Sequence, residues 1–146
     1  MKYFSLPYFF VGIQLSCLFI IAATGPLLAN SDWGILVEFT GIFLAILAIY
    51  HMRIGNFNIA PVPKTEGELV TSGIYKYLRH PMYLAQLMAV IPLLYDHYTH
   101  FRLIVWFVLL INLLFKQHYE EKLLKNHFKG YSSYMKTSWR MIPFIY

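Results

Sequence analysis

Long apolar stretches alternate with short polar breaks along the chain, and this pattern predicts a bundle of membrane-spanning helices. The apolar runs extend over about residues 6–28, 33–50, 82–95 and 101–117. Because roughly 20 apolar residues suffice to cross a bilayer, we expect four spans in an all-α fold. The third run is the weakest, since about 14 residues at ~1.5 Å each cover roughly 20 Å of a ~30 Å hydrocarbon core. The third and fourth runs are therefore expected to form a short helical hairpin.

The basic residues predict how these helices are oriented. A long polar segment, residues 51–80, is punctuated by prolines and glycines and carries several lysines and arginines. The short turns near residues 30–32 and 96–100 carry none, whereas the tail after Lys116 is rich in lysine. Since cytoplasmic segments of membrane proteins carry an excess of Lys and Arg, we expect the long segment and both termini in the cytoplasm. The expected location is the inner membrane of a bacterium.

Composition narrows the class of protein further. With 146 residues, 58% of them hydrophobic and only 13% charged, the chain is expected to form a single membrane domain, residues 1–146, rather than a disordered or ordinary soluble one. The net charge of +5 comes from basic residues that flank apolar runs. Anionic lipid headgroups explain this charge better than nucleic acid does. The bilayer itself is therefore the expected partner, and no nucleic acid is expected.

The most chemically suggestive segment is Arg79-His80-Pro81. Proline is favoured at the first position of a helix, which predicts that His80 lies at the mouth of the third apolar helix. Free N–H groups and the positive end of the helix dipole favour an anion at such a position. A simpler alternative is that Arg79 and Lys76 only anchor the helix at the inner membrane surface.

Helix geometry predicts what lies opposite this segment. The rise from His80 to the turn near residue 98 is ~27 Å, and the descent from there to Glu120 is ~33 Å, so both ends return to a similar depth. We therefore expect Arg79 and His80 to meet Glu120 and Glu121. A cluster of cationic and acidic groups suits a zwitterionic ligand. The alternative is that Glu121 forms only an exposed helical pair with Lys125.

Two other polar positions are weaker candidates. Glu38 lies in the second apolar run, where a carboxylate is a functional candidate by default, but it is near enough to the outer surface to reach headgroup water. Asp96, His97 and His100 share a short turn that offers too few ligands for a metal ion. We expect no metal site.

Several of these segments together resemble a known enzyme family. They are Gly73–Tyr83, which contains the Arg-His-Pro motif, a hydrophobic hairpin, Glu120-Glu121, Phe128, Tyr131, Tyr134 and Arg140–Pro143. Their order is similar to that of the isoprenylcysteine carboxyl methyltransferase family, with which the phospholipid N-methyltransferases share a ground plan. The similarity covers about residues 64–144. One departure is Ala85-Gln86, where many members have Gly-Glu.

The resemblance implies an integral-membrane enzyme that transfers a methyl group from S-adenosylmethionine to a lipophilic or small acceptor at the cytoplasmic leaflet. The acceptor group can be a carboxylate, a thiol or an amine. The resemblance implies Arg79 and Glu121 as catalytic residues. The cofactor-binding residues that it implies, with the neighbouring aromatic side chains, are Tyr75, His80, Pro81, Tyr83, Glu120, Glu121, Tyr131 and Tyr134.

Two alternatives remain at the level of sequence. One is a membrane reductase of the sterol-reductase type, which binds NADPH but has further spans. The other is a non-catalytic protein that packs membrane helices and keeps the motif as an anchor. That protein would lack a nucleotide-sized cavity between the two motifs.

Overall fold

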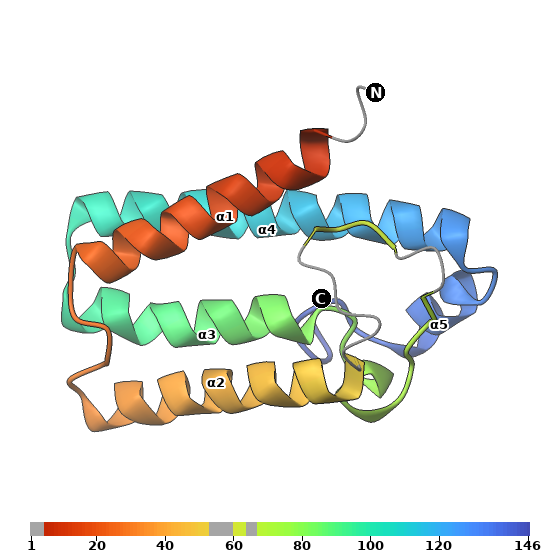
Figure 1. Ribbon diagram of the computed structural model, residues 1–146. Coiled ribbons are helices and arrows are strands. Elements are labelled where there is room, and N and C mark those ends of the chain that lie inside the picture. The colour runs from red at the N-terminus through yellow and green to blue at the C-terminus, as the bar shows by residue number, and fades with distance from the viewer. Residues whose placement is uncertain (1–4, 53–59, 64–66) are drawn as a thin grey trace.

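The computed structural model describes residues 5–52, 60–63 and 67–146. They form an all-α fold, as the apolar runs predict, and β structure within these residues is limited to one isolated bridge. Four long helices lie side by side, and the short helix α5 lies next to the end of α4, beyond the ends of α2 and α3 (Figure 1). The elements are α1 (Ser5–Ala23), α2 (Asp32–Met52), the 3-10 turn η1 (Gly73–Lys76), α3 (Pro81–Asp96), α4 (His100–His127) and α5 (Tyr131–Thr137).

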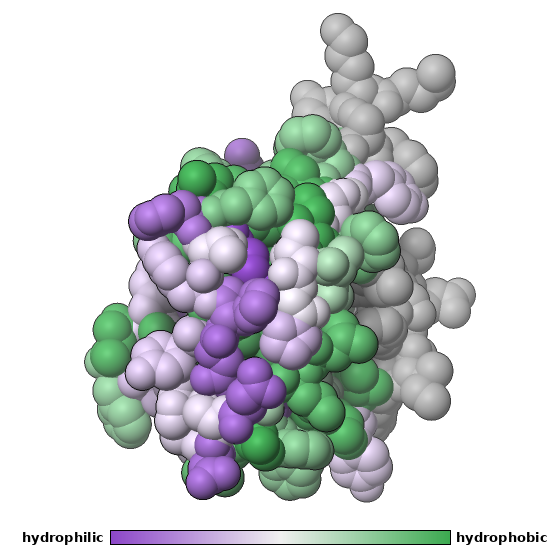
Figure 2. All heavy atoms as spheres, turned by 90° about the vertical axis from the view of Figure 1, so that its left-hand side faces the viewer, coloured by the Kyte–Doolittle hydropathy of each residue, from purple (hydrophilic) through white to green (hydrophobic). Residues whose placement is uncertain are grey.

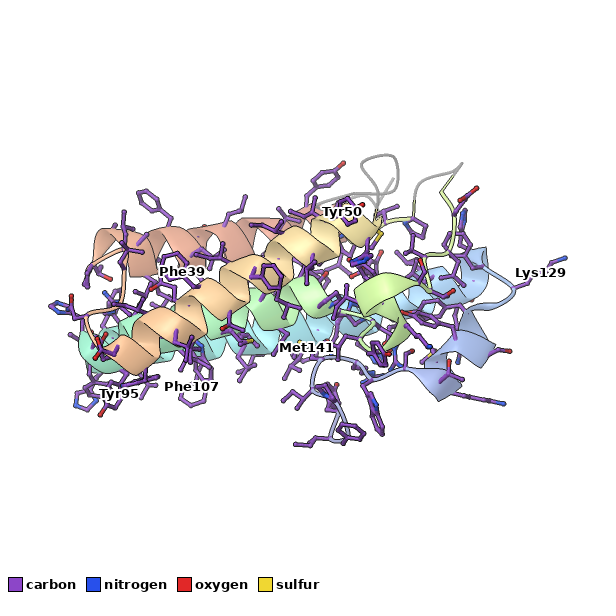
Figure 3. All side chains as sticks on the ribbon, turned by 90° about the horizontal axis from the view of Figure 1, so that it is seen from below. Phe39, Tyr50, Tyr95, Phe107, Lys129 and Met141 are labelled. Atoms are coloured by element: carbon purple, nitrogen blue, oxygen red, sulfur yellow. The ribbon has the colours of Figure 1, made fainter. Side chains whose placement is uncertain are left out.

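Three of the helices are long and apolar enough to cross a membrane: Leu6–Ala23, Asp32–Met52 and His100–His127. Their outer faces carry exposed aromatic and aliphatic side chains such as Phe43, which is 60% exposed. Phe39 and Phe107 lie along the length of the bundle, whereas Lys129 lies beyond it (Figure 3). This surface identifies a membrane protein, because lipid rather than water covers exposed apolar helix faces. Helix α3 has only 16 residues, so a fourth complete span stays a prediction.

The first helix is shorter than the apolar run that contains it. We expected it to continue to Leu28, but α1 ends at Ala23. Pro26 lacks an N–H group and disfavours helical geometry in Gly25, so the helix cannot continue through this point. Gly25 also lies directly over Arg102, since an added Cβ atom would be 1.8 Å from a guanidinium nitrogen. Apolar content alone therefore overestimated the length of this helix.

The loop that follows α1 is held by two carboxylates. Asp96 accepts hydrogen bonds from the backbone N–H groups of Asn30, at 2.6 Å, and Ser31, at 3.0 Å. Buried Glu38 accepts one from the N–H of Ala29 at 2.8 Å. Hydrophilic residues form a band across this end of the molecule, surrounded by apolar ones (Figure 2). Both carboxylates therefore act on the loop at the end opposite α5.

The helices pack mainly as two pairs, α2 with α3 and α1 with α4. Within the first pair, Gly41 lies so close to α3 that an added Cβ atom would be 2.8 Å from the carbonyl oxygen of Ala85 and 3.0 Å from the nitrogen of Ala89. Small residues allow such close approach, which is how helices associate where lipid supplies no hydrophobic driving force. The space between the two pairs is where the cavity described below forms.

The C-terminal tail pairs with the segment that precedes α3. Leu78 and Trp139 form a parallel bridge, the N–H of Arg79 donates to the carbonyl of Trp139 at 2.8 Å, and the N–H of His80 donates to that of Arg140 at 2.9 Å. These bonds hold the tail beside the mouth of α3. The pairing thereby fixes the backbone of the Arg-His-Pro motif.

The close approach at Gly41 gives a first prediction. Gly41→Ala should lower the free energy of unfolding by about 1–3 kcal/mol, because the new methyl group meets backbone atoms that cannot move aside. Gly12→Ala is the matched control, since no atom lies within 4 Å of its added Cβ. It should be neutral or stabilise α1 by roughly 0.5–1 kcal/mol. Thermal unfolding of both variants in detergent measures the difference, and equal midpoints would contradict the packing described.

Candidate functional site

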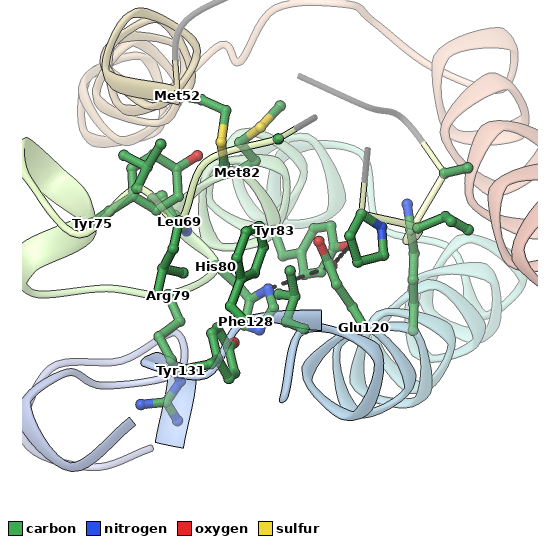
Figure 4. Close-up of a pocket in the computed structure, with 18 of the residues that line it drawn as sticks. Met52, Leu69, Tyr75, Arg79, His80, Met82, Tyr83, Glu120, Phe128 and Tyr131 are labelled. Atoms are coloured by element: carbon green, nitrogen blue, oxygen red, sulfur yellow. Dashed lines mark hydrogen bonds and ion pairs between the residues drawn. The ribbon is translucent and has the colours of Figure 1, made fainter. Parts of the chain in front are cut away.

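A cavity of about 320 Å³ lies between the two helix pairs, near the end of the bundle where α5 lies. Small-molecule sites typically occupy roughly 300–1,000 Å³, so the volume is sufficient for a ligand of cofactor size. Its walls come from α1, α2, η1, α3, α4, α5 and, between α2 and η1, from residues 60–63 and 67–70. Side chains of His80 and Tyr83 from α3 and of Glu120 and Phe128 from the α4 side converge on it (Figure 4).

All of the site residues expected from the sequence line this cavity, with the exception of Glu121. Those that do are Tyr75, Arg79, His80, Pro81, Tyr83, Glu120, Tyr131 and Tyr134. The two halves of the motif, separated by about forty residues, thus meet as the helix rise predicted. The role expected of each residue stays a prediction.

His80, Tyr83 and Glu120 form one group of contacting side chains at the mouth of α3. Pro81 opens the helix and His80 is its N-cap, as expected. The rings of His80 and Tyr83 are stacked, with centroids 5.2 Å apart and an interplanar angle of 3°. The hydroxyl of Tyr83 donates to Glu120 Oε2 at 2.6 Å, and His80 Nδ1 lies 3.7 Å from the same oxygen. Since 27% of the Glu120 side chain stays exposed, this carboxylate is accessible to a ligand.

Arg79, Glu121 and Arg140 form a second group around the buried carboxylate of Glu121. Arg79 Nε lies 2.7 Å from Glu121 Oε1, and Arg140 Nε lies 2.9 Å from Glu121 Oε2. Arg79 Nη1 also donates to the backbone carbonyls of Met135 and Ser138. Its guanidinium group points away from the centre of the cavity (Figure 4). The alternative pairing of Glu121 with Lys125 is wrong, because Glu121 is only 3% exposed and its carboxylate contacts these two arginines.

These contacts indicate what the second group does in the folded chain. Glu121 belongs to α4, Arg79 precedes α3, and Arg140 belongs to the tail, so one carboxylate connects three segments. The catalytic assignment of Arg79 and Glu121 stays a prediction, and the geometry favours a positioning role for both. His80 Nε2 lies 3.4 Å from Glu121 Oε1, so the first and second groups adjoin each other.

Three tyrosines form the wall nearest the tail. The hydroxyl of Tyr134 donates to the backbone carbonyl of Tyr75, and the rings of Tyr131 and Tyr134 lie 5.7 Å apart in an edge-to-face arrangement. Burial raises the pKa of Tyr134 to about 12, and it also raises the pKa of Tyr75 and of Tyr131 above the ordinary value. All three phenols are therefore uncharged at neutral pH and present aromatic faces to the cavity.

Sequence reasoning missed a group of polar residues on the opposite wall. Lys116 Nζ donates to Gln14 Oε1 at 2.6 Å, and Gln14 Nε2 donates to Gln86 Oε1 at 2.8 Å. The three side chains belong to α4, α1 and α3, and all line the cavity. A signal was present, because polar residues within apolar runs are rare and usually face the interior of a bundle.

Other lining residues had no usable signal. Glu68 and Leu69 lie in a segment whose sequence indicates only a loop, and Met52 and Met82 read as ordinary apolar positions. Phe128 belonged to the resemblance but was assigned no role. Which apolar residues line a cavity depends on how the helices are rotated, and composition does not specify rotation.

The second group gives a prediction about stability. Glu121→Gln removes the charge that Arg79 and Arg140 share, and breaking a buried ion pair in this way costs roughly 3–5 kcal/mol. The thermal midpoint in detergent should fall, and protease should cleave the tail faster than in the parent chain. Lys125→Gln, an exposed position on the same helix, is the control and should change stability by less than about 0.5 kcal/mol. An unchanged midpoint for Glu121→Gln would contradict the positioning role.

Comparison with known proteins agrees with this geometry. A search of curated proteins found no significant match. A family model described as phospholipid methyltransferase matches residues 30–130, which is more than two thirds of the chain and includes both halves of the motif. The match ends before Tyr131, so the tail that supplies Arg140 lies beyond it. The chain therefore belongs to the phospholipid methyltransferase family, a family of membrane methyltransferases.

Proposed function

We propose that the chain is an S-adenosylmethionine-dependent methyltransferase that acts on a lipophilic or small acceptor at the cytoplasmic leaflet. The observation that carries this proposal is the cavity of about 320 Å³ at the point where the Arg-His-Pro motif and Glu120 meet. A merely anchoring motif requires no cavity there. The family match supports methyl transfer in particular.

The residues that line the cavity fit the chemical groups of this cofactor. Glu120 is accessible and accepts hydrogen bonds, which suits an ammonium group or ribose hydroxyls. His80, at the mouth of α3, suits the carboxylate. The aromatic rings of Tyr75, Tyr83 and Tyr131 suit the adenine and the positively charged sulfur, because a cation is attracted to a ring face. When bound, the cofactor supplies an activated methyl group.

The chain then contributes by orienting the acceptor relative to the methyl group and by excluding water from the cavity. Methyl transfer from a sulfonium requires chiefly that the nucleophile is held in line with the methyl group, so positioning supplies most of the acceleration. The C-terminal tail, fixed through Arg79 and Glu121, covers the end of the cavity with Tyr131 and Tyr134. A carboxylate acceptor needs no base at neutral pH, whereas an amine or thiol acceptor does. For those acceptors His80 or Glu120 is the proposed base, because both line the cavity.

The same proposal includes the topology. Helix α3 runs beside α2 along the bundle and, with its flanking residues, would complete a fourth crossing (Figure 1). The lysine-rich tail and the basic segment before α3 would then face the cytoplasm together with both termini. The location proposed is the inner membrane of a bacterium. The reductase and the non-catalytic alternative are not favoured, since the family match is to methyltransferases.

Calorimetric titration tests the cofactor directly. The detergent-purified protein should bind S-adenosylmethionine and its demethylated product S-adenosylhomocysteine, and it should give no saturable heat with NADPH. Protein that is folded by circular dichroism yet binds neither sulfur nucleoside at millimolar concentration would overturn the methyltransferase proposal. Binding of NADPH alone would favour the reductase.

Two substitutions locate the cofactor within the cavity. His80→Ala and Glu120→Gln should each weaken binding of S-adenosylhomocysteine by about tenfold or more, because each removes one polar partner worth about 1–3 kcal/mol. His118→Ala, an exposed histidine on α4, is the matched control and should bind normally. Thermal midpoints of Glu120→Gln and His118→Ala should stay close to that of the parent chain, and circular dichroism should show that His80→Ala, which truncates a buried ring, is still helical. Normal binding by both cavity variants would show that the cofactor lies elsewhere.

A further inference from the structure

Residues 141–146 of the tail form a tight turn outside the cavity. The side chains of this turn face two ways. Met141 is only 3% exposed and belongs to the apolar core of the bundle, whereas Phe144 is 84% exposed and Ile145 is 78% exposed. Ile142 is exposed as well. One side of the turn therefore packs against the helices, and the other presents an apolar ridge that no described residue covers.

The turn folds back along the bundle instead of extending away from it. Met141 lies alongside the long helices, whereas Lys129 lies beyond their ends (Figure 3). Gln117 Nε2 of α4 donates to the hydroxyl of Tyr146 at 3.1 Å. The rise from His100, where α4 begins, to Gln117 is ~26 Å, which is within the ~30 Å of a hydrocarbon core. The turn thus lies at a depth that lipid occupies.

Helix α3 leaves room for such a turn at this end of the bundle. Its 16 residues rise ~24 Å, so it is shorter than the ~30 Å core by roughly one helical turn. The tail pairs with the residues directly before α3 through the bridge between Leu78 and Trp139. The apolar turn therefore continues the lipid-facing surface at the end where α3 is too short.

The backbone of the turn suits an apolar environment, where an unpaired N–H group is costly. The N–H groups of Met141 and Ile142 each donate to the carbonyl oxygen of Tyr146 at 3.0 Å. Those of Ile145, at 3.2 Å, and Tyr146, at 3.0 Å, donate to the carbonyl oxygen of Ile142. Pro143 has no N–H group. The turn therefore pairs these four donors within itself and does not need water for them.

The residues next to the turn have the order that is typical of a membrane interface. Trp139 and Tyr77 are exposed and adjacent, since the N–H of Trp139 donates to the carbonyl of Tyr77 at 2.8 Å. Lys76 Nζ lies 5.8 Å from the centroid of the Tyr77 ring. Trp and Tyr rings settle at the level of the lipid headgroups, and Lys side chains reach from there toward water. The sequence of lysine, aromatic rings and apolar turn matches a descent from the headgroups into the acyl chains.

We propose that residues 141–146 enter the leaflet nearest to α5 as a lipid-embedded anchor, with Ile142, Phe144 and Ile145 among the acyl chains and Trp139 at the headgroup level. Lipid is the occupant that fits this ridge, because the turn lies at the depth of the helices and is continuous with the exposed apolar faces that lipid covers.

The anchor adjoins the charged group that holds the tail. Arg140 directly precedes the turn and pairs with Glu121, and its Nη1 donates to the hydroxyl of Tyr146 at 2.7 Å. The guanidinium carbon also lies 5.2 Å from the centroid of the Tyr146 ring. Lipid contact with the turn therefore stabilises the position in which Arg140 reaches Glu121. This role is independent of the reaction proposed above.

Spin labelling measures the depth of the turn directly. The sequence contains one cysteine, the buried Cys17, so in a Cys17→Ala background each new cysteine carries the only nitroxide label. In nanodiscs of palmitoyl-oleoyl phosphatidylcholine, a label on Phe144→Cys should collide more with oxygen, which dissolves in lipid, than with a water-soluble nickel chelate. The ratio of the two collision rates should be similar to that of Phe43→Cys on the outer face of α2. It should exceed that of Lys129→Cys by about fivefold or more.

The other outcomes of this measurement overturn the anchor. A Phe144→Cys label with the ratio of Lys129→Cys would show that the turn lies in water. A label shielded from both reagents, with dipolar broadening between copies of the chain, would show that a second copy covers the turn. Circular dichroism should give the same helicity for the three labelled variants, because all three side chains are exposed.

A charged substitution tests the lipid contact without a label. Ile145→Asp places a carboxylate among acyl chains, where it is costly, so the turn should leave the leaflet. Trypsin should then cut the tail about fivefold faster or more than in the parent chain in the same nanodiscs. Ser133→Asp, at an exposed position on α5, adds the same charge outside the turn and should change the rate by less than about twofold. Equal cleavage rates for the two variants would contradict the anchor.

Discussion

The buried ion pairs of Glu121 are the interaction on which the rest of the site depends. One carboxylate holds Arg79, which precedes α3, and Arg140, which belongs to the tail. At the low effective dielectric of a buried position, these attractions are much stronger than on a surface, but each group would be costly without its partners. The tail is therefore held in one arrangement rather than several. That arrangement sets Tyr131 and Tyr134 over the cavity and fixes the backbone of His80.

The long helices must associate with one another without a hydrophobic driving force. Helices α2 and α3 meet through the close approach at Gly41. Helices α1 and α4 use polar contacts, since the Asn112 amide donates to the carbonyl of Phe10 at 3.0 Å and Lys116 donates to Gln14. Each pair is thus held by local and specific contacts. Between the pairs, buried apolar side chains of α1, α3 and α4 form one core cluster, and the ligand-sized space lies along the same boundary, near the end where α5 lies.

The sequence predicted most of the architecture but only part of the site. Apolar runs specified the long helices, and because helices are rigid, their rise alone predicted that His80 and Glu120 would meet. The end of α1 was misjudged because apolar content does not reveal a break that Pro26 imposes. The bridge between Leu78 and Trp139 had no counterpart in the pattern, since a single parallel pairing has no periodicity. Lys116 was missed for a related reason: an isolated polar residue does not indicate which helix supplies its partner.

The division into two helix pairs also implies an order in which contacts between the helices can form during synthesis. Helices α2 and α3 are neighbours in the chain and can associate as soon as both have left the ribosome, whereas α1 must wait for α4. Arg140 follows later still, and only then can Glu121 acquire both of its partners. Contacts between segments far apart in the chain form late, because closing long loops costs entropy. The ion pairs of Glu121 can therefore form only after α4 and the tail have been synthesised, when the other long helices are already complete.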